Sequence, residues 1–421
     1  MAYLQADIDE EIFMMLDKCT SESLVKLRPE FAAFMHNGKI LVQIKKALYG
    51  CVQSSKLWYD RFKLFLESIG FVCNVVDPCV FNRVSKLDGS QCTIAVHVDD
   101  GLATCKNKAE LDLLVSELEG EFTNGLTVTE GPKFVYLGMS VDLSKRSCSL
   151  TMNNYIKELL KHTNVTTSAR TPASMNLFSI DDDSPILEEE KREDLHSVVA
   201  SLLFLATRTR PDILLPVTFL CSRVTVATEE DHDAKMIRVL SYLNRTIDLP
   251  LIIGKRGSPV IVNCYADASF AVHPDFKSHG SILISCGHGF VWCKCAKQKL
   301  VTKSSTEAEL VTLSDAVSMA AWAIQFLKCQ GYDVRPNLFQ DNLSTMALAN
   351  NGRSTSDRTR HINIRYFFIK QYLDNNTMTM EHCPATDMIA DILTKPLQGY
   401  EFERLRDLLL GIEEDTFPFK N

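Results

Sequence analysis

The chain lacks the sequence signals of a membrane protein, a secreted protein and a zinc finger. No apolar run among its 421 residues reaches transmembrane length, and acids stand near the start, where a signal peptide is basic. The 14 cysteines run from Cys19 to Cys383 without the spacing of a disulfide framework. Cys293 and Cys295 stand too close together for a usual zinc pair and have no matching Cys/His pair. We therefore expect reduced, mostly buried thiols, a cytoplasmic setting and no membrane partner.

Positive charge is also scarce, because the formal net charge is −8. Residues 181–194 carry most of this excess, since eight acids and two bases there contribute −6. This segment is typical of a solvated linker or of the residues that lead into a helix. By contrast, residues 292–303 contain no acid and four lysines, which are Lys294, Lys297, Lys299 and Lys303. Such a basic stripe follows a phosphate backbone or, equally well, protects an exposed strand edge.

The remaining composition is that of an ordinary globular protein, with 46% apolar and 23% charged residues. The length suits two or three domains with ample core. Any function must therefore be found in local patterns.

Three acids in the C-terminal half lie at the ends of predicted strands or in a short helix that follows one. Asp267 lies in the first predicted strand, Asp341 follows the fourth, and Asp391 lies in a short helix after the fifth. Alternation places Asp267 on the strand face opposite to Val262. The pattern predicts a small mixed α/β fold. Its elements are a helix from Ser304 onward and strands over 259–269, 281–285, 289–295, 336–340 and 377–382.

The helix predicted from Ser304 onward carries two candidate acids, Glu307 and Glu309. At a helical period, its apolar stripe lies closer to Glu309 than to Glu307. We therefore choose Glu309 as the fourth acid and expect Glu307 to point towards solvent.

Four carboxylates gathered in an apolar setting stay ionised only if cations hold them. Oxygen ligands of this kind suit Mg²⁺, with Mn²⁺ as an alternative. The residues therefore indicate a two-metal nuclease site formed by Asp267, Glu309, Asp341 and Asp391. Any one of these acids taken alone would be interpreted as solvated surface.

The order of elements and acids resembles ribonuclease H, and five motifs resemble its form in copia-type retrotransposon polyproteins. The motifs are Tyr265-Ala266-Asp267-Ala268-Ser269, Ser304-Ser305-Thr306-Glu307-Ala308-Glu309, Gln340-Asp341-Asn342, Arg360-His361-Ile362 and Ala390-Asp391-Ile392-Leu393-Thr394-Lys395-Pro396-Leu397. The resemblance implies cleavage of the RNA strand of RNA–DNA hybrids with two Mg²⁺ ions. Asn342, Arg358 and Arg360 are candidate contacts to the hybrid; for Asn342 the alternative is a helix N-cap, and for the two arginines a surface role.

A second acidic motif stands in the N-terminal part of the chain. Residues 92–102 form an apolar strand pattern interrupted by Asp99 and Asp100, as at a hairpin tip. Paired carboxylates there suit Mg²⁺ in phosphoryl transfer, although an isolated Asp-Asp is more often a polar turn.

The surrounding segments resemble the palm of copia-type reverse transcriptases. The similar segments are 47–59, with Tyr49, Gly50 and Gln53, then 97–100, 134–139 and 207–213. The resemblance implies a nucleotidyltransferase that binds template-primer through Tyr49, Gly50 and Gln53. His97 stands where the family usually has Tyr. The family pattern also places a third metal-binding aspartate and the fingers upstream of Ala2, so we expect the polymerase to be impaired in this chain.

The predicted fold class is α/β (α+β), a truncated reverse-transcriptase palm and thumb/connection followed by a mixed-sheet RNase H-like domain. The expected divisions are a partial palm over 1–126, a thumb and connection over 127–255 with an acidic linker at 180–194, an RNase H-like domain over 256–398, and a C-terminal helix and tail over 399–421.

Two alternatives stay open: a full polymerase–nuclease whose sequence starts late, and a non-catalytic nucleic-acid-binding relic. The fold alone does not exclude an integrase or a resolvase, but the helix with Asp391 and the linked palm favour RNase H. Other retroelement polyprotein parts are possible partners, and the resemblance implies a virus-like particle in the cytoplasm, with nuclear entry possible.

Overall fold

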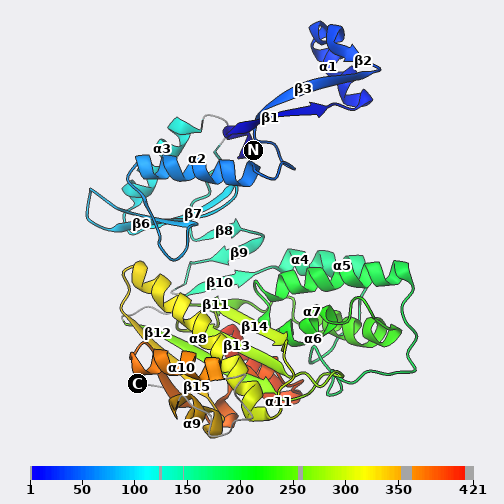
Figure 1. The fold of residues 1–421 in the computed structure, drawn as a ribbon, viewed down its shortest axis with the longest axis vertical. Coiled ribbons are helices and arrows are strands. Elements are labelled where there is room, and N and C mark those ends of the chain that lie inside the picture. Colours follow the sequence, from blue (N-terminus) through cyan, green and yellow to red (C-terminus); the bar gives the residue numbers. More distant parts are fainter. Residues whose placement is uncertain (1, 123–125, 146, 255–258, 352–362, 413–421) are drawn as a thin grey trace. The chain divides into compact units, whose positions relative to one another are not determined.

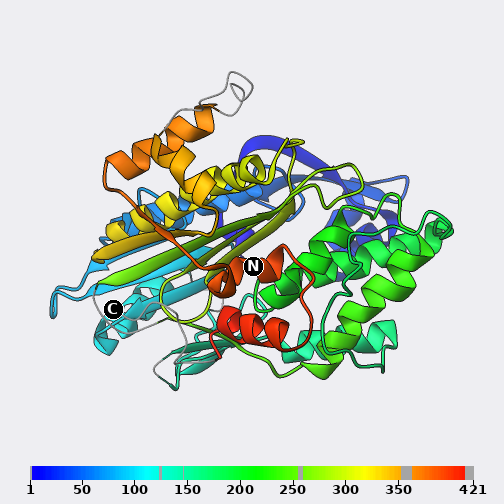
Figure 2. The same ribbon diagram turned by 90° about the horizontal axis from the view of Figure 1, so that it is seen from below.

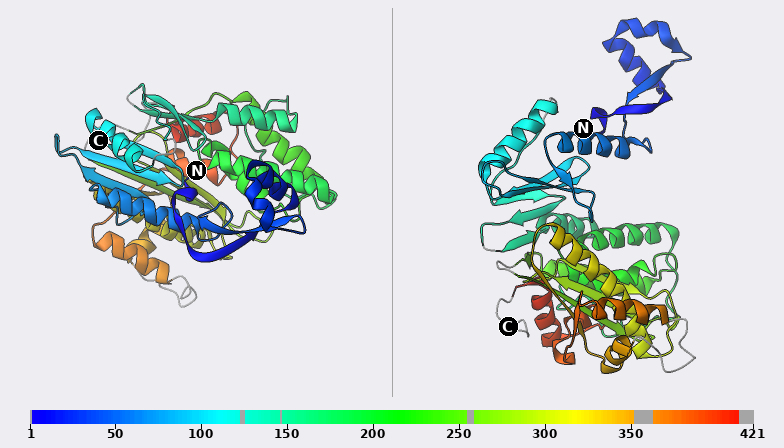
Figure 3. Two further views of the ribbon diagram at one scale, coloured as in Figure 1. Left: turned by 90° about the horizontal axis from the view of Figure 1, so that it is seen from above. Right: turned by 60° about the vertical axis from the view of Figure 1, so that its left-hand side comes forward.

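The computed structural model describes residues 2–122, 126–145, 147–254, 259–351 and 363–412. Contacts between Cα atoms divide the chain into two compact units, Met1–Thr129 (unit 1) and Glu130–Asn421 (unit 2). Their elements can be followed in Figure 1 and Figure 3. Each unit is described by itself.

Unit 1 begins with a small antiparallel sheet in the order β1-β3-β2, formed by β1 (Asp7–Met15), β2 (Met35–His36) and β3 (Lys39–Lys46). A helix α1 (Lys18–Leu27) connects β1 to the rest. From its sequence, with several acids close together, the segment 2–16 is expected to be helical or turn-rich, and over 7–15 this expectation is wrong. The acids of β1 are tolerated in a strand because most of its side chains are exposed and Asp7 pairs with Lys46 on β3, with 2.6 Å between oxygen and nitrogen.

The second sheet of unit 1 has the order β4-β5-β6-β7, with β4 (Val72–Cys73), β5 (Val80–Val84), β6 (Gln91–His97) and β7 (Asp100–Cys105). Two helices, α2 (Ser54–Ser68) and α3 (Lys108–Glu121), share one apolar core with it. Trp58 and Phe62 of α2 meet Phe81 and Ile94 of the strands and Leu114 of α3 in this core. The spacing of Trp58, Phe62 and Leu66 keeps one helix face apolar.

Unit 2 starts with a four-stranded antiparallel sheet and a group of helices. The strands are β8 (Lys133–Tyr136), β9 (Met139–Asp142), β10 (Cys148–Thr151) and β11 (Leu251–Ile253). The helices are α4 (Asn153–Thr163), α5 (Glu189–Ala206), α6 (Leu214–Cys221) and α7 (Ile237–Arg245). The acidic segment leads into α5, whose first turn holds Glu189 and Glu190; acids there interact favourably with the helix dipole.

The central sheet of unit 2 has the order β14-β13-β12-β15-β16, from β12 (Val260–Ser269), β13 (His279–Ser285), β14 (Trp292–Lys297), β15 (Val334–Gln340) and β16 (Thr379–His382). β12 pairs antiparallel with β13 and parallel with β15, and β15 pairs parallel with β16. All five predicted strands are present. The sheet is therefore mixed, in agreement with the predicted fold class.

Alternation along β12 places its side chains on two faces with different neighbours. Val262, Cys264 and Ala266 pack with the long helix α8 (Ser305–Cys329), together with α10 (Asn363–Asp374). Tyr265 packs on the opposite side with α6 and with α11 (Gly399–Leu410). Figure 2 shows α8 and α11 on opposite faces of the sheet. Helices on both sides thus bury the central strands.

In the described part of the chain, α8 is the one helix that is long and apolar enough to cross a membrane, judged by length and composition alone. More than half of its apolar window is buried inside unit 2, where Leu310, Leu313 and Val317 pack against the sheet. A buried core helix accounts for this apolar character.

Candidate metal centre

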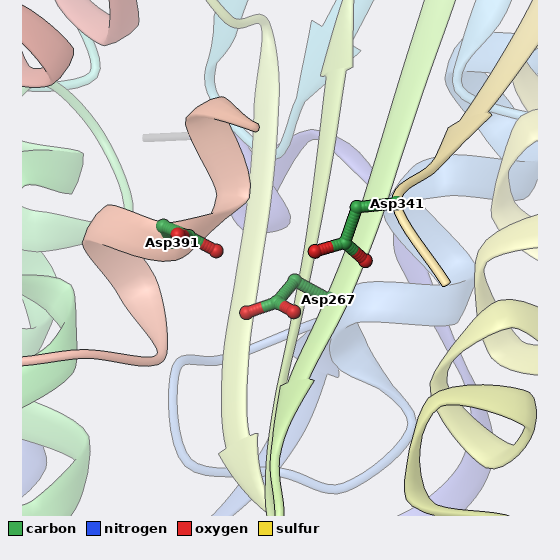
Figure 4. Close-up of side chains that lie close together, drawn as sticks. All are labelled: Asp267, Asp341 and Asp391. Carbon is green, nitrogen blue, oxygen red and sulfur yellow. The ribbon is translucent and has the colours of Figure 1, made fainter. Parts of the chain in front are cut away.

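Three carboxylates from separate elements meet at one edge of the central sheet. Asp267 lies near the end of β12, and Asp341 directly follows β15. The parallel register pairs Tyr265 with Phe339, so two residues further on Asp267 stands beside Asp341. Asp391 faces them from the short 3-10 helix η7 (Ile389–Leu393), as Figure 4 shows. One carboxylate oxygen from each lies within 4.8 Å of the others.

Hydroxyl groups attach η7 to the sheet. The Ser281 hydroxyl donates to the carbonyl oxygen of Ala390 at 3.0 Å, and the Ser269 hydroxyl donates to that of Thr394 at 2.9 Å. The Thr394 hydroxyl in turn donates to the carboxylate of Asp267. These bonds hold Asp391 against the strand that carries Asp267. In the sequence, Thr394 is recognised only as part of a motif. Its position three residues after Asp391 was the one sequence feature that could have indicated its contact with the acids.

Glu309 lies in the early part of α8 and is supported by Asn342. The Asn342 amide donates to Glu309 Oε1 at 3.1 Å, while its own oxygen accepts from the backbone of Ser344 and Thr345 at the start of α9 (Leu343–Asn351). Asn342 is therefore a helix N-cap, as one alternative held, and it also orients an acid beside the cluster. Glu309 is not one of the three acids whose oxygens lie within 4.8 Å.

The other candidate acid, Glu307, lies in the first turn of α8. Ser304 Oγ accepts from the Glu307 backbone at 3.2 Å, and the Glu307 carboxylate accepts from the Lys303 backbone at 2.8 Å, as in a capping box. Glu307 is only 7% exposed, so the expectation that it points to solvent was wrong. Helical periodicity could not show this, because the capping bonds turn the side chain back over the helix end.

The acids of this site are crowded in a place with little water. Burial, followed by the charges of Asp341 and Asp267, raises the pKa of Glu309 to about 8, although the bond from Asn342 opposes the shift. Burial and then Asp267 raise the pKa of Asp391 to about 7, and the same two causes raise the pKa of Asp341. Ionised carboxylates here are unfavourable without added positive charge.

Three oxygens at this site have no hydrogen-bond partner although they are buried: Glu309 Oε2, Asp341 Oδ1 and Asp391 Oδ1. Buried polar atoms normally have partners, so unpartnered acceptors on two acids of the cluster and on Glu309 fit a cation. All the candidate metal ligands are hard carboxylate oxygens, which suit Mg²⁺ or Mn²⁺. Lys395 supplies one positive charge, with its nitrogen 2.7 Å from Asp391 Oδ2. The fit of the residues to divalent cations is therefore good.

The second acidic motif forms the tip of the β6–β7 hairpin, as its pattern predicted. His97 pairs with Asp100 across the turn, and Val98 has a positive φ of 54°. Both Asp99 and Asp100 are exposed. The Tyr49 hydroxyl donates to Asp99 at 2.8 Å, and this bond, with burial second, raises the pKa of Tyr49.

The neighbouring candidates, Gly50 and Gln53, precede α2. Gly50 has a φ of 103°, a conformation that favours glycine, and Gln53 occupies the N-cap position of α2 without a capping bond from its side chain. Both lie in the loop that carries Tyr49, on the exposed side of unit 1. The structure therefore joins this loop to the hairpin tip through Tyr49 and Asp99.

The four lysines of the basic stripe divide into two pairs. Lys297 contacts Asp275 at 2.7 Å and Lys294 lies 3.7 Å from Asp315, so acids distant in sequence offset two of the charges. Lys299 and Lys303 are exposed, and no ion pair is found for either within the described ranges. The candidates Arg358 and Arg360 lie outside the described residues.

Comparison with known proteins shows what the chain is similar to. Residues 1–175 match the family model described as reverse transcriptase (RNA-dependent DNA polymerase). The chain is 28% identical over 420 residues to the retrovirus-related Pol polyprotein from transposon TNT 1-94 of Nicotiana tabacum, which covers 97% of this chain and 30% of that protein. It is 29% identical over 412 residues to the Pol polyprotein from transposon RE1 of Arabidopsis thaliana, covering 96% and 26%.

Over nearly its whole length this chain is similar to copia-type retrotransposon Pol polyproteins. A more distant relative is the transposon TyH3 Gag-Pol polyprotein of Saccharomyces cerevisiae, 24% identical over 428 residues, with 96% of this chain and 23% of that one covered. The chain thus spans less than a third of the length of the curated Pol relatives it matches.

One solved structure, titled "Structure of the foamy viral protease-reverse transcriptase in complex with RNA/DNA hybrid", aligns to this chain with a TM-score of 0.48 and 16% identity. The alignment covers 84% of this chain and 40% of that one.

Proposed function

We propose that unit 2 hydrolyses the RNA strand of RNA–DNA hybrids at the Asp267–Asp341–Asp391 cluster. The observation that carries the proposal is the meeting of three carboxylates, two of which have an unpartnered buried oxygen, in a chain similar to retroelement Pol polyproteins. Residues 256–398 are the RNase H-like domain in this proposal. The preceding residues are a palm over 1–126 and a thumb and connection over 127–255.

Each acid has a role that follows from its surroundings. Asp267 and Asp341, on neighbouring parallel strands, would hold divalent cations together with Asp391 on η7. Glu309, oriented by Asn342, would complete the carboxylate set. When bound, two such cations supply an activated water and stabilise the leaving 3′ oxygen. The chain contributes the fixed spacing of the acids, which the hydroxyl bonds to η7 maintain.

We assign recognition of the hybrid to exposed groups near the edge of the central sheet where the three carboxylates meet. Lys299 and Lys303 would contact phosphates, and discrimination of RNA from DNA would depend on the 2′-hydroxyl and on the shape of the hybrid's minor groove. Template-primer binding and DNA synthesis would belong to unit 1, where Asp99 and Asp100 would hold the metal and Tyr49 contacts Asp99. Polymerase activity is proposed to be weak, because His97 departs from the family motif and two exposed acids hold cations poorly.

The test is Mg²⁺-dependent cleavage of a labelled RNA–DNA hybrid by the full chain, compared with Asp341→Asn. We expect the substitution to reduce the rate by at least about a hundredfold, because it removes a cation ligand. Asp100→Asn is the matched control, since it makes the same change in the hairpin of unit 1 and should leave cleavage unchanged.

Two outcomes would contradict the proposal. Folded wild-type protein that leaves the hybrid intact at all Mg²⁺ and Mn²⁺ concentrations favours the non-catalytic, nucleic-acid-binding relic. Equal loss of cleavage in Asp341→Asn and Asp100→Asn places the chemistry outside the cluster.

A further inference from the structure

One side chain supplies positive charge to the carboxylate cluster from within the protein. Among the described residues, Lys395 forms an ion pair with an acid of the cluster. Its nitrogen lies 2.7 Å from Asp391 Oδ2. The other basic group close by, His382, reaches only the backbone oxygen of Asp341, at 3.2 Å. Lys395 is therefore the fixed counter-charge of the cluster.

The same turn that positions Asp391 also positions Lys395. The Lys395 backbone donates to the carbonyl oxygen of Asp391 at 2.8 Å, so the two side chains leave one tight turn four residues apart. Between them, Thr394 is bonded to Asp267 and to Ser269. The lysine side chain is 43% exposed, whereas that of Asp391 is 9% exposed. Its ammonium group thus covers the solvent side of a buried carboxylate.

Lys395 engages only one oxygen of Asp391. Oδ2 accepts from the ammonium group, while the buried Oδ1 has no partner. The lysine charge also interacts with Asp267 and Asp341, so it is felt across the whole cluster. A cation that binds the free oxygens is attracted by the acids but repelled by this neighbouring positive charge.

We propose that Lys395 competes with the divalent cation for the cluster: it offsets the carboxylate charge when the cation is absent and weakens cation affinity when it is present. This inference rests on the proposed function, because it assumes that the cluster binds Mg²⁺ or Mn²⁺. In this role Lys395 acts through the acids of the cluster, and it sets the concentration of divalent cation that the enzyme needs. The ammonium group keeps its proton throughout.

The test compares wild type with Lys395→Met, which keeps the length of the side chain and removes its charge. Mg²⁺ alone, then Mn²⁺ alone, is titrated calorimetrically into the full metal-free chain. We expect Lys395→Met to bind Mg²⁺ about tenfold more tightly, because repulsion between two nearby cations is lost. In EDTA its midpoint of thermal unfolding should be lower than that of wild type, and added Mg²⁺ should raise it by more.

Two control variants separate charge from shape. Lys395→Arg keeps the positive charge and should bind Mg²⁺ as wild type does. Lys370→Met removes a lysine from another i,i+4 ion pair of unit 2, with Asp374 on α10, and should leave Mg²⁺ affinity unchanged. A Lys395→Met protein with unchanged or weaker Mg²⁺ affinity overturns the inference, and so does absence of Mg²⁺ binding by both wild type and Lys395→Met.

The outcomes also distinguish this inference from the proposed function. If the affinity change occurs but no protein cuts the hybrid, Lys395 has the stated role and the nuclease proposal fails. If wild type cuts the hybrid but Lys395→Met has ordinary affinity, only the inference fails.

Discussion

The acids at the β6–β7 hairpin tip are exposed to solvent, whereas in the unit 2 cluster Asp267 and Asp391 are buried and Asp341 is partly buried. Asp99 and Asp100 are adjacent in sequence and share one turn. Asp267, Asp341 and Asp391 come from three elements far apart in sequence, and their oxygens still lie within 4.8 Å of one another.

The difference concerns what holds each group together. Water stabilises exposed carboxylates, so a hairpin with two acids needs no cation to fold. Burial removes that water, and the crowded acids of unit 2 then depend on Lys395 and on added cations. Unpartnered buried oxygens are found in the cluster and not among the hairpin acids. Burial with convergence is thus a stronger sign of a metal centre than adjacent acids in sequence.

The largest effect on stability that we expect from burial concerns two histidines of unit 2. His273 and His279 are bonded to each other at 2.9 Å, and His279 also contacts Cys295 at 2.8 Å. Burial, with help from Lys297, lowers the pKa of His273 to about 4, and burial with His273 lowers the pKa of His279 to about 3. The unfolded chain binds these protons near pH 6.5, so the stabilisation is fully present above that pH.

As the pH falls from 6.5 towards 4, unit 2 should lose about 1.4 kcal/mol per pH unit for each histidine. The measurement is urea unfolding at several pH values in a Trp58→Phe background, where Trp292 and Trp322 report on unit 2. His273→Phe, which suits the surrounding rings of Phe178 and Phe219, should make the pH dependence shallower. An unchanged slope would show that the pair does not control acid stability. In unit 1, His36 and His97 are exposed.

A smaller effect tests the crowding of the acids directly. In EDTA, Asp341→Asn should stabilise unit 2 by about 1 kcal/mol, because it removes one charge from a repulsive group and offers the neighbouring acids a donor. Asp100→Asn should change stability by less than about 0.5 kcal/mol, as exposed substitutions do. Urea unfolding of both variants in EDTA makes the comparison. Destabilisation by Asp341→Asn would mean that the acids do not repel one another.

The smallest expected effects concern the lysines of the basic stripe. In the cleavage-deficient Asp341→Asn protein, Lys299→Ala or Lys303→Ala should weaken hybrid binding a few-fold. Each should also reduce by about 1 the slope of the logarithm of the binding constant against the logarithm of the salt concentration. Lys294→Ala and Lys297→Ala should have less effect, because Asp315 and Asp275 already offset these charges. Fluorescence anisotropy over a range of salt concentrations distinguishes the two pairs. Equal losses for all four would contradict this division.

Much of the fold of unit 2 could be predicted from periodicity. Alternation in β12 correctly placed Val262 and Asp267 on opposite faces. The apolar stripe of α8 favoured Glu309, which accepts a hydrogen bond from Asn342, and its role as a fourth metal ligand stays a prediction. The failures were local. β1 was not recognised as a strand, because an exposed strand need not alternate between polar and apolar residues. The burial of Glu307 was missed, since a capping bond depends on the geometry of the helix end.

The sequence by itself determined which elements form and which residues they carry: strands ending near Asp267 and Asp341, a short turn with Asp391, and a hairpin with Asp99 and Asp100. These features depend on neighbours along the chain. Only the tertiary structure decided which acids meet, that Lys395 neutralises one of them, and that Lys294 and Lys297 already have partners. The physical reason is that electrostatic interactions act through space, and burial, which sets their strength, follows from packing between residues far apart in sequence.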